Sequence, residues 1–546
     1  MKKILALDYI FLGILVFIIT LQPYFMYGAI NYYESGIYLP QINEFLHGKV
    51  LYRDMFILRG PLEIFMPAYL MQLFGKHIAV LNGYFYFGTV LTLIIYAVFA
   101  LRVFSTRGFA YLFTLVVVAR TFPRVCFNIW GGIRFGLGIL AILLAINFLK
   151  RKNSFWLFFA GLVSSFAFWT SFEMGILSFI SLVAMLCVYG YLEKENIKTI
   201  LGHMSIYAIG AILASTPFIY YLFLNNALHF YIDSIRVVLS SMTKVFDPSL
   251  CFDTPMNLKE FLLAFSPLNH NFKYTLPFFF YLFIAIYLFK GFIKNKAKIL
   301  DLPIIPVFIY GIFLYKSTFR DIEGPQYRMA LQPLLLIMFF YLERFHLYLN
   351  QKKGMVSGIK RPLIFFLILL IPLYSVIFSV HKYNKRFFIF SEARRIILNK
   401  THAAIPYADP QPTPLKSDRA KGVIVPQAQA MEIDGVVEYI SSHAQAREIV
   451  FAFPDIGLYN FLTDRPPLGR FYSAEFSFME PAWFEEMMAD IKSKRPRFVI
   501  CAKEFTRLKP FMPTVGKYIQ KMSQFLQENY KIRKSFETVN VLERKI

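Results

Sequence analysis

Eleven long apolar segments constrain the fold of this 546-residue chain more than any other feature of its sequence. Each has about 15 to 25 residues, and a helix needs about 20 apolar residues to cross the hydrocarbon core of a bilayer. The segments lie at 8–29, 79–101, 108–123, 135–149, 154–172, 174–192, 200–224, 274–290, 302–318, 329–347 and 362–380. Only 17% of the residues are charged, against about 25% in a usual soluble domain. The sequence therefore predicts an α-helical polytopic membrane protein with about eleven transmembrane helices.

The basic residues predict how these helices are oriented. If the N-terminus is cytoplasmic, alternation of the spans places the densest basic loops, such as Lys150-Arg151-Lys152 and residues 290–298, on the cytoplasmic side. The loops 30–78, 123–134, 225–273 and 319–328 then lie outside, together with the C-terminal residues. The net charge of +24 is explained by this topology and by contacts with anionic membrane lipids, so we expect no nucleic-acid partner.

Composition also predicts the domain organisation. Residues 1–380 form the transmembrane domain, and the first outer loop at 30–78 contains two short interfacial helices at 36–47 and 61–75. Residues 381–426 are expected to be a linker, rich in Pro and Ala toward its end. Helix and strand patterns alternate in residues 427–546, which predicts a C-terminal α/β soluble domain. Its helices are expected at 427–445, 481–493 and 515–530, and its strands at 449–453, 498–502, 532–537 and 539–543.

Charged residues next to membrane ends are the candidate site, because a partly desolvated ion needs a partner or a function. Carboxylates mixed with arginines suit group transfer from a phosphate-linked donor: the carboxylate accepts a proton and the arginines bind the phosphate. The candidates are Glu34, Arg53, Asp54, Arg59, Arg124, Arg134, Glu173, Arg320, Asp321 and Arg328. The structural alternatives are ion pairs that order the loops, Glu173 acting as a helix cap, and Arg124 or Arg134 reaching to lipid phosphate.

No recognisable cofactor motif accompanies these residues. The four cysteines are far apart and show no zinc-binding spacing, and there is no dinucleotide, Walker, GxSxG or HExxH motif. We therefore expect no tightly bound metal and no organic cofactor.

The first outer loop, "YESGIYLPQINEFLHGKVLYRDMFILRGPLEIFMPAYLMQLFG", resembles the corresponding loop of the GT-C superfamily of membrane glycosyltransferases, which includes protein O-mannosyltransferases and the aminoarabinose transferase of lipid A. The matching residues are Gly48, Leu51, Tyr52, Arg53, Asp54, Pro61, Leu62, Phe74 and Gly75. The run Leu458-Tyr-Asn-Phe-Leu-Thr-Asp-Arg-Pro-Pro467 also looks like the outer domain of bacterial members. Two positions differ from the pattern: Glu34 stands where Asp is usual, and the late segment "RDIEGPQYR" lacks the usual His.

The resemblance implies an inverting transferase that moves a sugar from a polyprenyl-phosphate donor to a lipid, glycan or protein acceptor at the outer face of a bacterial inner (plasma) membrane. In that role Glu34 is the general base or the acid that positions the acceptor, Asp54 is its partner, and the loop arginines bind phosphate. Some relatives use a divalent ion. Two alternatives from other classes are a transporter or flippase of lipid-linked saccharides and a non-enzymatic membrane assembly protein. The site residues cluster toward one face and no internal repeat is evident, which argues against a transporter.

Overall fold

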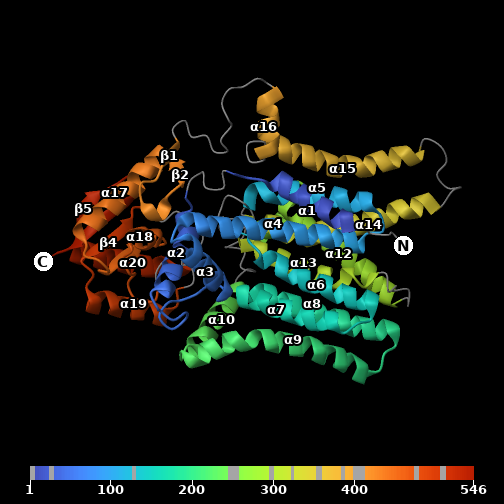
Figure 1. Cartoon of the computed structure of the whole chain (residues 1–546), viewed down its shortest axis with the longest axis horizontal. Coiled ribbons are helices and arrows are strands. Elements are labelled where there is room, and N and C mark those ends of the chain that lie inside the picture. Colours follow the sequence, from blue (N-terminus) through green and yellow to red (C-terminus); the bar gives the residue numbers. More distant parts are fainter. Residues whose placement is uncertain are drawn as a thin grey trace. The chain divides into compact units, whose positions relative to one another are not determined.

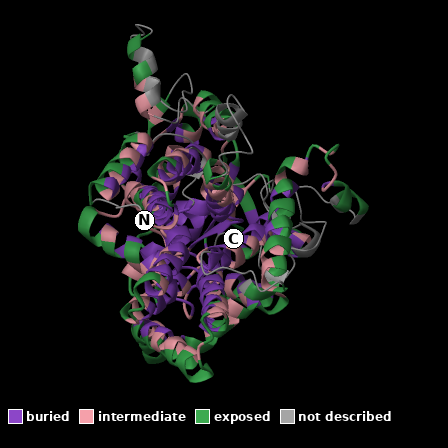
Figure 2. Cartoon of the chain, turned by 90° about the vertical axis from the view of Figure 1, so that its right-hand side faces the viewer, coloured by how far each residue is buried: buried purple, intermediate pink, exposed green. Residues whose placement is uncertain are grey.

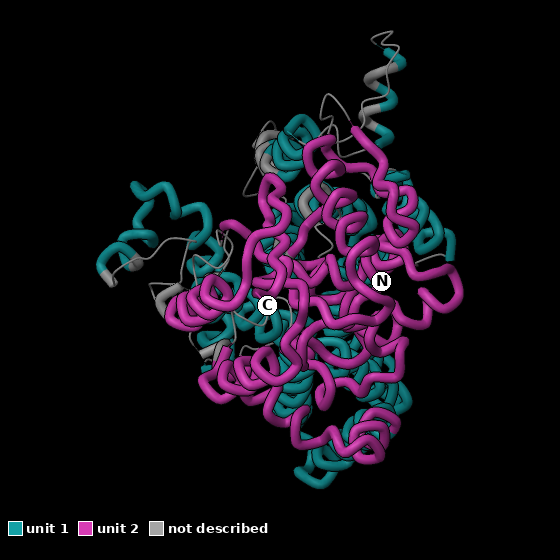
Figure 3. The backbone as a smooth tube through the Cα atoms, turned by 90° about the vertical axis from the view of Figure 1, so that its left-hand side faces the viewer, with its two compact units in different colours: residues 1–23, 85–216, 256–404 teal, residues 24–84, 217–255, 405–546 magenta. Residues whose placement is uncertain are grey.

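The computed structural model describes residues 6–23, 30–125, 131–243, 258–293, 301–320, 325–351, 360–382, 388–397, 412–471, 479–504 and 512–545. These residues are mostly helical, and the labelled strands lie in the C-terminal part (Figure 1). The chain divides into two compact units (Figure 3). Unit 1 comprises residues 1–23, 85–216 and 256–404, and unit 2 comprises residues 24–84, 217–255 and 405–546.

Unit 1 consists of helices, and α4 and α9 also extend into unit 2. The helices are α1 (Ala6–Thr20), α4 (Ile78–Val103), α5 (Arg107–Val125), α6 (Arg134–Arg151), α7 (Phe155–Thr170), α8 (Phe172–Glu193), α9 (Ile197–Leu224), α11 (Leu258–Leu263), α12 (Phe272–Ile293), α13 (Ile304–Lys316), η4 (Ser317–Arg320), α14 (Pro325–Gln351), α15 (Lys360–Lys382) and α16 (Phe388–Ile397). Each of the eleven predicted apolar segments overlaps one of these helices, although residues 24–29 of the first segment lie outside the described residues. Consecutive helices pack on each other, as α6, α7 and α8 do, because very short loops return the chain antiparallel (Figure 1).

Five of the described helices are long and apolar enough to cross a membrane: α4, α8, α9, α12 and residues 326–351 of α14. Large apolar side chains are exposed on α9 and α12, for example Ile212 at 66% and Phe283 at 70% exposure. Figure 2 shows exposed residues, in green, along the outer surfaces of helices. An apolar surface of this extent requires lipid, so the chain is an integral membrane protein. The helices α1, α7 and α13 are apolar but shorter, and the total of about eleven spans stays a prediction.

Glycine allows two helices of unit 1 to approach closely. A Cβ atom on Gly161 of α7 would lie 2.0 Å from the carbonyl oxygen of Tyr207, and one on Gly210 of α9 would lie 2.1 Å from that of Phe158. Both contacts are with backbone, which cannot move aside as a flexible side chain can. The two helices therefore pack through small residues, as helices in membranes commonly do.

A four-stranded sheet forms the centre of the C-terminal part of unit 2. The strands β3 (Val450–Phe453), β4 (Phe498–Ala502), β6 (Val539–Arg544) and β5 (Tyr530–Ser535) are neighbours in that order. β3 and β4 are parallel, and the other pairs are antiparallel. The helices are α17 (Gln427–His443), α18 (Leu458–Thr463), α19 (Pro481–Lys494) and α20 (Met512–Asn529). The predicted C-terminal α/β fold is confirmed.

Alternate residues of the sheet pack against different helices, as the pleat of a strand requires. Phe451, Val499 and Leu542 belong to a hydrophobic cluster with Trp483 of α19 and Met522 of α20. On the opposite face, the ring of Phe498 lies 6.4 Å from that of Tyr439 in α17. The sheet therefore lies between two helical layers.

Residues 381–426, expected to be a linker, contain regular structure. They include α16, a 3-10 turn at Asp418–Ala420, and the antiparallel pair β1 (Pro412–Pro414) and β2 (Ile424–Pro426). The expected three-part division of the chain into a membrane domain, a linker and an outer domain stays a prediction.

The first loop and the C-terminal part belong to the same unit. The loop contains α2 (Tyr32–Leu46) and α3 (Leu62–Phe74), as its amphipathic pattern predicted, and α10 (Leu228–Thr243) joins the same unit. Phe56 of the loop and Val237 of α10 are part of the hydrophobic cluster of α19 and α20. The Phe56 ring lies 4.8 Å from that of Trp483, and its backbone N–H donates to the carbonyl of Arg470. The segment next to Asp54 is therefore fixed to the C-terminal core.

Candidate active site

Glu34 lies in the first turn of α2. Asn31 is the N-cap residue, and its side-chain oxygen accepts a hydrogen bond from the Glu34 backbone N–H at 3.3 Å. A carboxylate in a first helical turn is stabilised by the helix dipole. Asn31 and Glu34 also have the spacing of a capping box, in which Glu or Gln stands three residues after the cap. With 9% of its surface exposed, Glu34 can either hold the helix end or accept a proton from a bound molecule.

Asp54 and Arg53 form a closed pair in a tight loop. Arg53 Nε and Nη2 donate to the two carboxylate oxygens of Asp54 at 2.8 and 3.0 Å, and the Val50 N–H adds a third bond at 2.9 Å. Arg53 Nη1 donates to the carbonyl of Asn225 at 3.1 Å. The guanidinium holds the pKa of Asp54 below its usual range, so this carboxylate is ionised at neutral pH. The geometry agrees with the loop-ordering alternative, and phosphate binding by Arg53 stays a prediction.

The backbone of this loop is held in an uncommon conformation. Tyr52 has a φ angle of +70°, in the left-handed region that residues other than glycine adopt rarely. Its side chain is fully buried, and its hydroxyl donates to the carbonyl of Arg59 at 2.9 Å. Buried contacts therefore maintain the loop shape that presents Arg53, Asp54 and Arg59.

Glu63, in the first turn of α3, is a buried acid that the sequence did not single out as a site residue. It is 1% exposed, and its carboxylate accepts a hydrogen bond from the hydroxyl of Tyr38 at 2.7 Å. Tyr38 follows Glu34 by one helical turn, and Gln41, on the same face of α2, donates to the carbonyl of Phe56 at 2.8 Å. One face of α2 therefore contacts the segment that includes Asp54 and Glu63.

Three other predicted site residues have described side chains in unit 1. Arg134 is the first residue of α6 and is 1% exposed, with its guanidinium 4.9 Å from the ring centre of Phe135. Glu173 is the second residue of α8, directly after the hairpin from α7 that the sequence predicted. Arg328 lies in the first turn of α14, directly after the buried Tyr327.

Three further predicted residues are described only in part or not at all. Arg124 lies in α5 and Arg320 ends η4, and in both cases the side chain is outside the described residues. Asp321 lies outside the described residues altogether. Among the residues that the structure describes, no group of three or more His, Cys, Asp or Glu side chains is placed to hold a metal ion.

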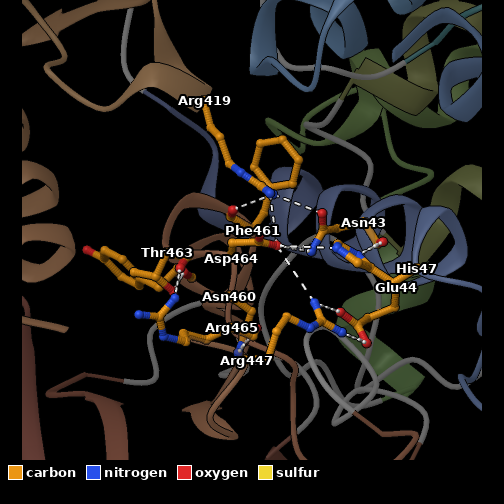
Figure 4. A network of polar contacts seen from close by, with 11 residues as sticks. Asn43, Glu44, His47, Arg419, Arg447, Asn460, Phe461, Thr463, Asp464 and Arg465 are labelled. Atoms are coloured by element: carbon orange, nitrogen blue, oxygen red, sulfur yellow. Dashed lines mark hydrogen bonds and ion pairs between the residues drawn. The ribbon is translucent and has the colours of Figure 1, made fainter. Parts of the chain in front are cut away.

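A charged network that the sequence did not reveal joins α2 to the C-terminal residues of unit 2. Figure 4 shows the side chains of Arg419, Arg447, Asn43 and His47 converging on Asp464. Arg419 Nη2 lies 2.8 Å from Asp464 Oδ1, and Asn43 Nδ2 donates to the same oxygen at 3.1 Å. Burial alone would raise the pKa of Asp464, but the Asn43 hydrogen bond and the neighbouring cations hold it below its usual value.

The same network satisfies a buried acid of α2. Both carboxylate oxygens of Glu44, which is 3% exposed, accept from Arg447 at 3.2 and 3.4 Å. These partners are separated by 403 residues, so no local pattern could have paired them. The network therefore fixes the last turn of α2 to the C-terminal residues of unit 2.

Known proteins were compared with the chain by sequence and by structure. No protein family and no curated protein sequence matches it. The crystal structure of ArnT from Cupriavidus metallidurans bound to undecaprenyl phosphate superposes with a TM-score of 0.51 at 11% identity, covering 98% of this chain and 97% of ArnT. The apo form of the same ArnT gives 0.48 at 12% identity with the same coverage. The oligosaccharyltransferase AglB from Archaeoglobus fulgidus, in complex with an inhibitory peptide and a dolichol-phosphate, gives 0.49 at 11% identity over 98% of this chain and 74% of AglB.

At this identity the superposition on ArnT concerns the fold, and it covers nearly the whole of both chains. The chain therefore shares the fold of ArnT, the GT-C fold that the pattern of its first loop predicted.

Proposed function

We propose that this protein is a glycosyltransferase that moves a sugar from a polyprenyl-phosphate donor to a lipid, glycan or protein acceptor at the outer face of the membrane. The observation that carries the proposal is the placement of Glu34, a nearly buried carboxylate in the first turn of α2, in a chain with the GT-C fold. ArnT, which has the same fold, was crystallised with undecaprenyl phosphate. This supports a lipid phosphate as the leaving group here.

In the proposed reaction, an acceptor oxygen forms a bond to the anomeric carbon of the sugar, with inversion. The bond from that carbon to the phosphate oxygen breaks, and polyprenyl phosphate leaves with the electron pair. The acceptor proton passes to the carboxylate of Glu34 as general base. Arg59, Arg134 and Arg328 are candidates to bind the phosphate, because a guanidinium can donate two parallel hydrogen bonds to it. Arg53, Arg124 and Arg320 stay candidates for the same role.

Asp54 and Glu173 are assigned supporting roles. Asp54 holds Arg53 and thereby the shape of the loop, and Glu173 occupies the first turn of α8. Asp321 remains a candidate polar contact. We further propose that transfer requires no tightly bound metal. EDTA treatment should therefore leave turnover unchanged. Loss of activity in EDTA that Mg²⁺ or Mn²⁺ fully restores would contradict this proposal.

The direct test is turnover by the purified full-length protein. Undecaprenyl phosphate carrying a radiolabelled hexose or pentose is incubated with the protein and with total membrane lipid as acceptor, and transferred label is separated from donor. A mock purification from cells that lack the protein is the control for contaminating activity. Transfer by the wild type alone supports a transferase. Label that crosses the membrane of proteoliposomes while it stays on its original lipid would identify a flippase instead.

A further inference from the structure

The residue before the α2 cap is held by a side chain of the C-terminal part of unit 2. Gln429, in the first turn of α17, makes a reciprocal pair of hydrogen bonds with the backbone of Ile30. Its Oε1 accepts from the Ile30 N–H at 3.0 Å, and its Nε2 donates to the Ile30 carbonyl at 3.2 Å. An amide side chain that satisfies both backbone groups of one residue fixes the position and direction of the chain there.

A second contact, one helical turn further along α17, holds the same stretch. The hydroxyl of Tyr32 donates to Glu432 Oε1 at 3.4 Å, and Thr538 Oγ1 donates to the same oxygen at 2.6 Å. Burial raises the pKa of Tyr32 to about 12, so its hydroxyl keeps the proton it donates. The ring of Tyr32 also lies 5.9 Å from that of Tyr459 in α18.

These contacts determine where α2 begins, and therefore where Glu34 lies. Asn31 follows Ile30 directly, and it caps the helix by accepting from the Glu34 N–H. A shift of Ile30 moves the cap, and the cap carries the first turn with it. Catalytic geometry is sensitive to such shifts, because a displacement of about 1 Å can reduce turnover by roughly 10²-fold.

We propose that Gln429 is a positioning residue for Glu34: the C-terminal domain, through Gln429 and with support from Glu432, sets the first turn of α2 for proton transfer. This inference rests on the proposed function, because it assigns to the domain a part in the same reaction. Gln429 is not needed to hold α2 as a whole, since the Glu44–Arg447 and Asn43–Asp464 contacts secure its other end.

The chain offers a matched control for the test. Gln427 is the first residue of the same helix, and it is exposed. Gln429→Ala and Gln427→Ala are prepared as full-length proteins, each alone and combined with Glu34→Gln. Single-turnover rates at saturating donor are measured with the undecaprenyl-phosphate sugar that the wild type uses. Binding of undecaprenyl phosphate and thermal melting are measured on the same samples.

We expect Gln429→Ala to reduce the single-turnover rate at least about tenfold with undecaprenyl phosphate affinity unchanged, and Gln427→Ala to behave as the wild type. In the Glu34→Gln background, Gln429→Ala should cause no further loss, because the two residues act as one unit. Tyr32→Phe removes one hydroxyl only, and it carries the same test if Gln429→Ala does not yield folded protein.

Two results would overturn the positioning role of Gln429 and leave the proposed function intact. The first is a normal rate in Gln429→Ala when Glu34→Gln is slow. The second is an equal loss from Gln429→Ala in the wild-type and Glu34→Gln backgrounds, which would indicate general destabilisation. A Glu34→Gln protein with full turnover would instead remove Glu34 from the proposed mechanism, and the positioning role with it.

Discussion

The guanidinium of Arg53 donates two hydrogen bonds to the carboxylate of Asp54, the residue that follows it directly in the chain. The pair lowers the pKa of Asp54. Arg53 Nε, Nη1 and Nη2 all donate hydrogen bonds to groups of the protein itself. The carboxylate and the arginine that sequence analysis assigned to separate chemical roles therefore meet as one structural element of the first loop.

The Asp54 pair predicts a loss of stability in acid. A carboxyl whose folded pKa lies below its unfolded value of about 3.9 stabilises the folded state above that pH, and this contribution is lost as the pH falls through the folded pKa. We expect the melting temperature to fall between pH 5 and pH 3. Asp54→Asn should melt lower than the wild type at pH 7, and the difference should shrink at pH 3. A difference that is constant with pH would contradict the ion pair.

Glu34→Gln separates catalysis from helix capping. Glutamine serves in a capping box as glutamate does, so the variant should fold, melt and bind undecaprenyl phosphate nearly as the wild type. It cannot accept the acceptor proton, and turnover should fall at least about 100-fold. Glu34→Asp should retain intermediate activity. Normal turnover in a well-folded Gln variant would leave Asp54 as the next carboxylate to examine.

Arg134 tests the recognition of phosphate. Lysine keeps the charge but not the planar fork that binds two oxygens, so Arg134→Lys should restore only part of the undecaprenyl phosphate affinity that Arg134→Ala loses. Arg151→Lys, at the exposed end of the same helix, is the control and should bind normally. Equal binding by the wild type and both Arg134 variants would place the phosphate elsewhere.

Close packing of α7 and α9 predicts opposite outcomes for two glycines on one helix. Gly210→Ala would place a methyl group 2.1 Å from the Phe158 carbonyl, whereas a Cβ on Gly202 meets nothing within 4 Å. Overpacking of this kind costs about 1–3 kcal/mol or more. Gly210→Ala should melt well below the wild type in detergent, and Gly202→Ala should melt at the wild-type temperature or above it, since alanine favours helix. Similar melting of the two variants would exclude the close approach.

The proposed topology places the C-terminal domain outside the cytoplasm. A reporter that is active only in the periplasm, fused after residue 546, should be active, and the same reporter fused in the loop after α6 should be silent because that loop is basic. A silent C-terminal fusion together with an active fusion after α6 would reverse the orientation and put Glu34 on the opposite face from the one proposed.

The sequence predicted the regular elements well wherever one apolar pattern ran for a full helix or strand. Each of the eleven apolar segments overlaps a helix of the described residues, and β3 and β4 lie within a residue of their expected ends. Short elements escaped: α18 has six residues and β1 has three, too few to show a period. The loop pattern identified Arg53 and Asp54, but it left open whether they bind each other or a substrate. Glu44 carried no local signal at all, because its partner Arg447 is brought to it only by the tertiary fold.

The hydrogen bonds between Gln429 and the Ile30 backbone also have a consequence for biosynthesis. Ile30 and Gln429 are separated by 399 residues, and a ribosome adds roughly 5–20 residues per second. The start of α2 therefore leaves the ribosome on the order of half a minute before its partner exists. Phe56 likewise leaves the ribosome long before Trp483, the residue against whose ring it packs. The last part of the chain to be synthesised therefore supplies the packing partners of the first loop. A chain that terminates early would expose the apolar side chains of that loop to proteases at the membrane.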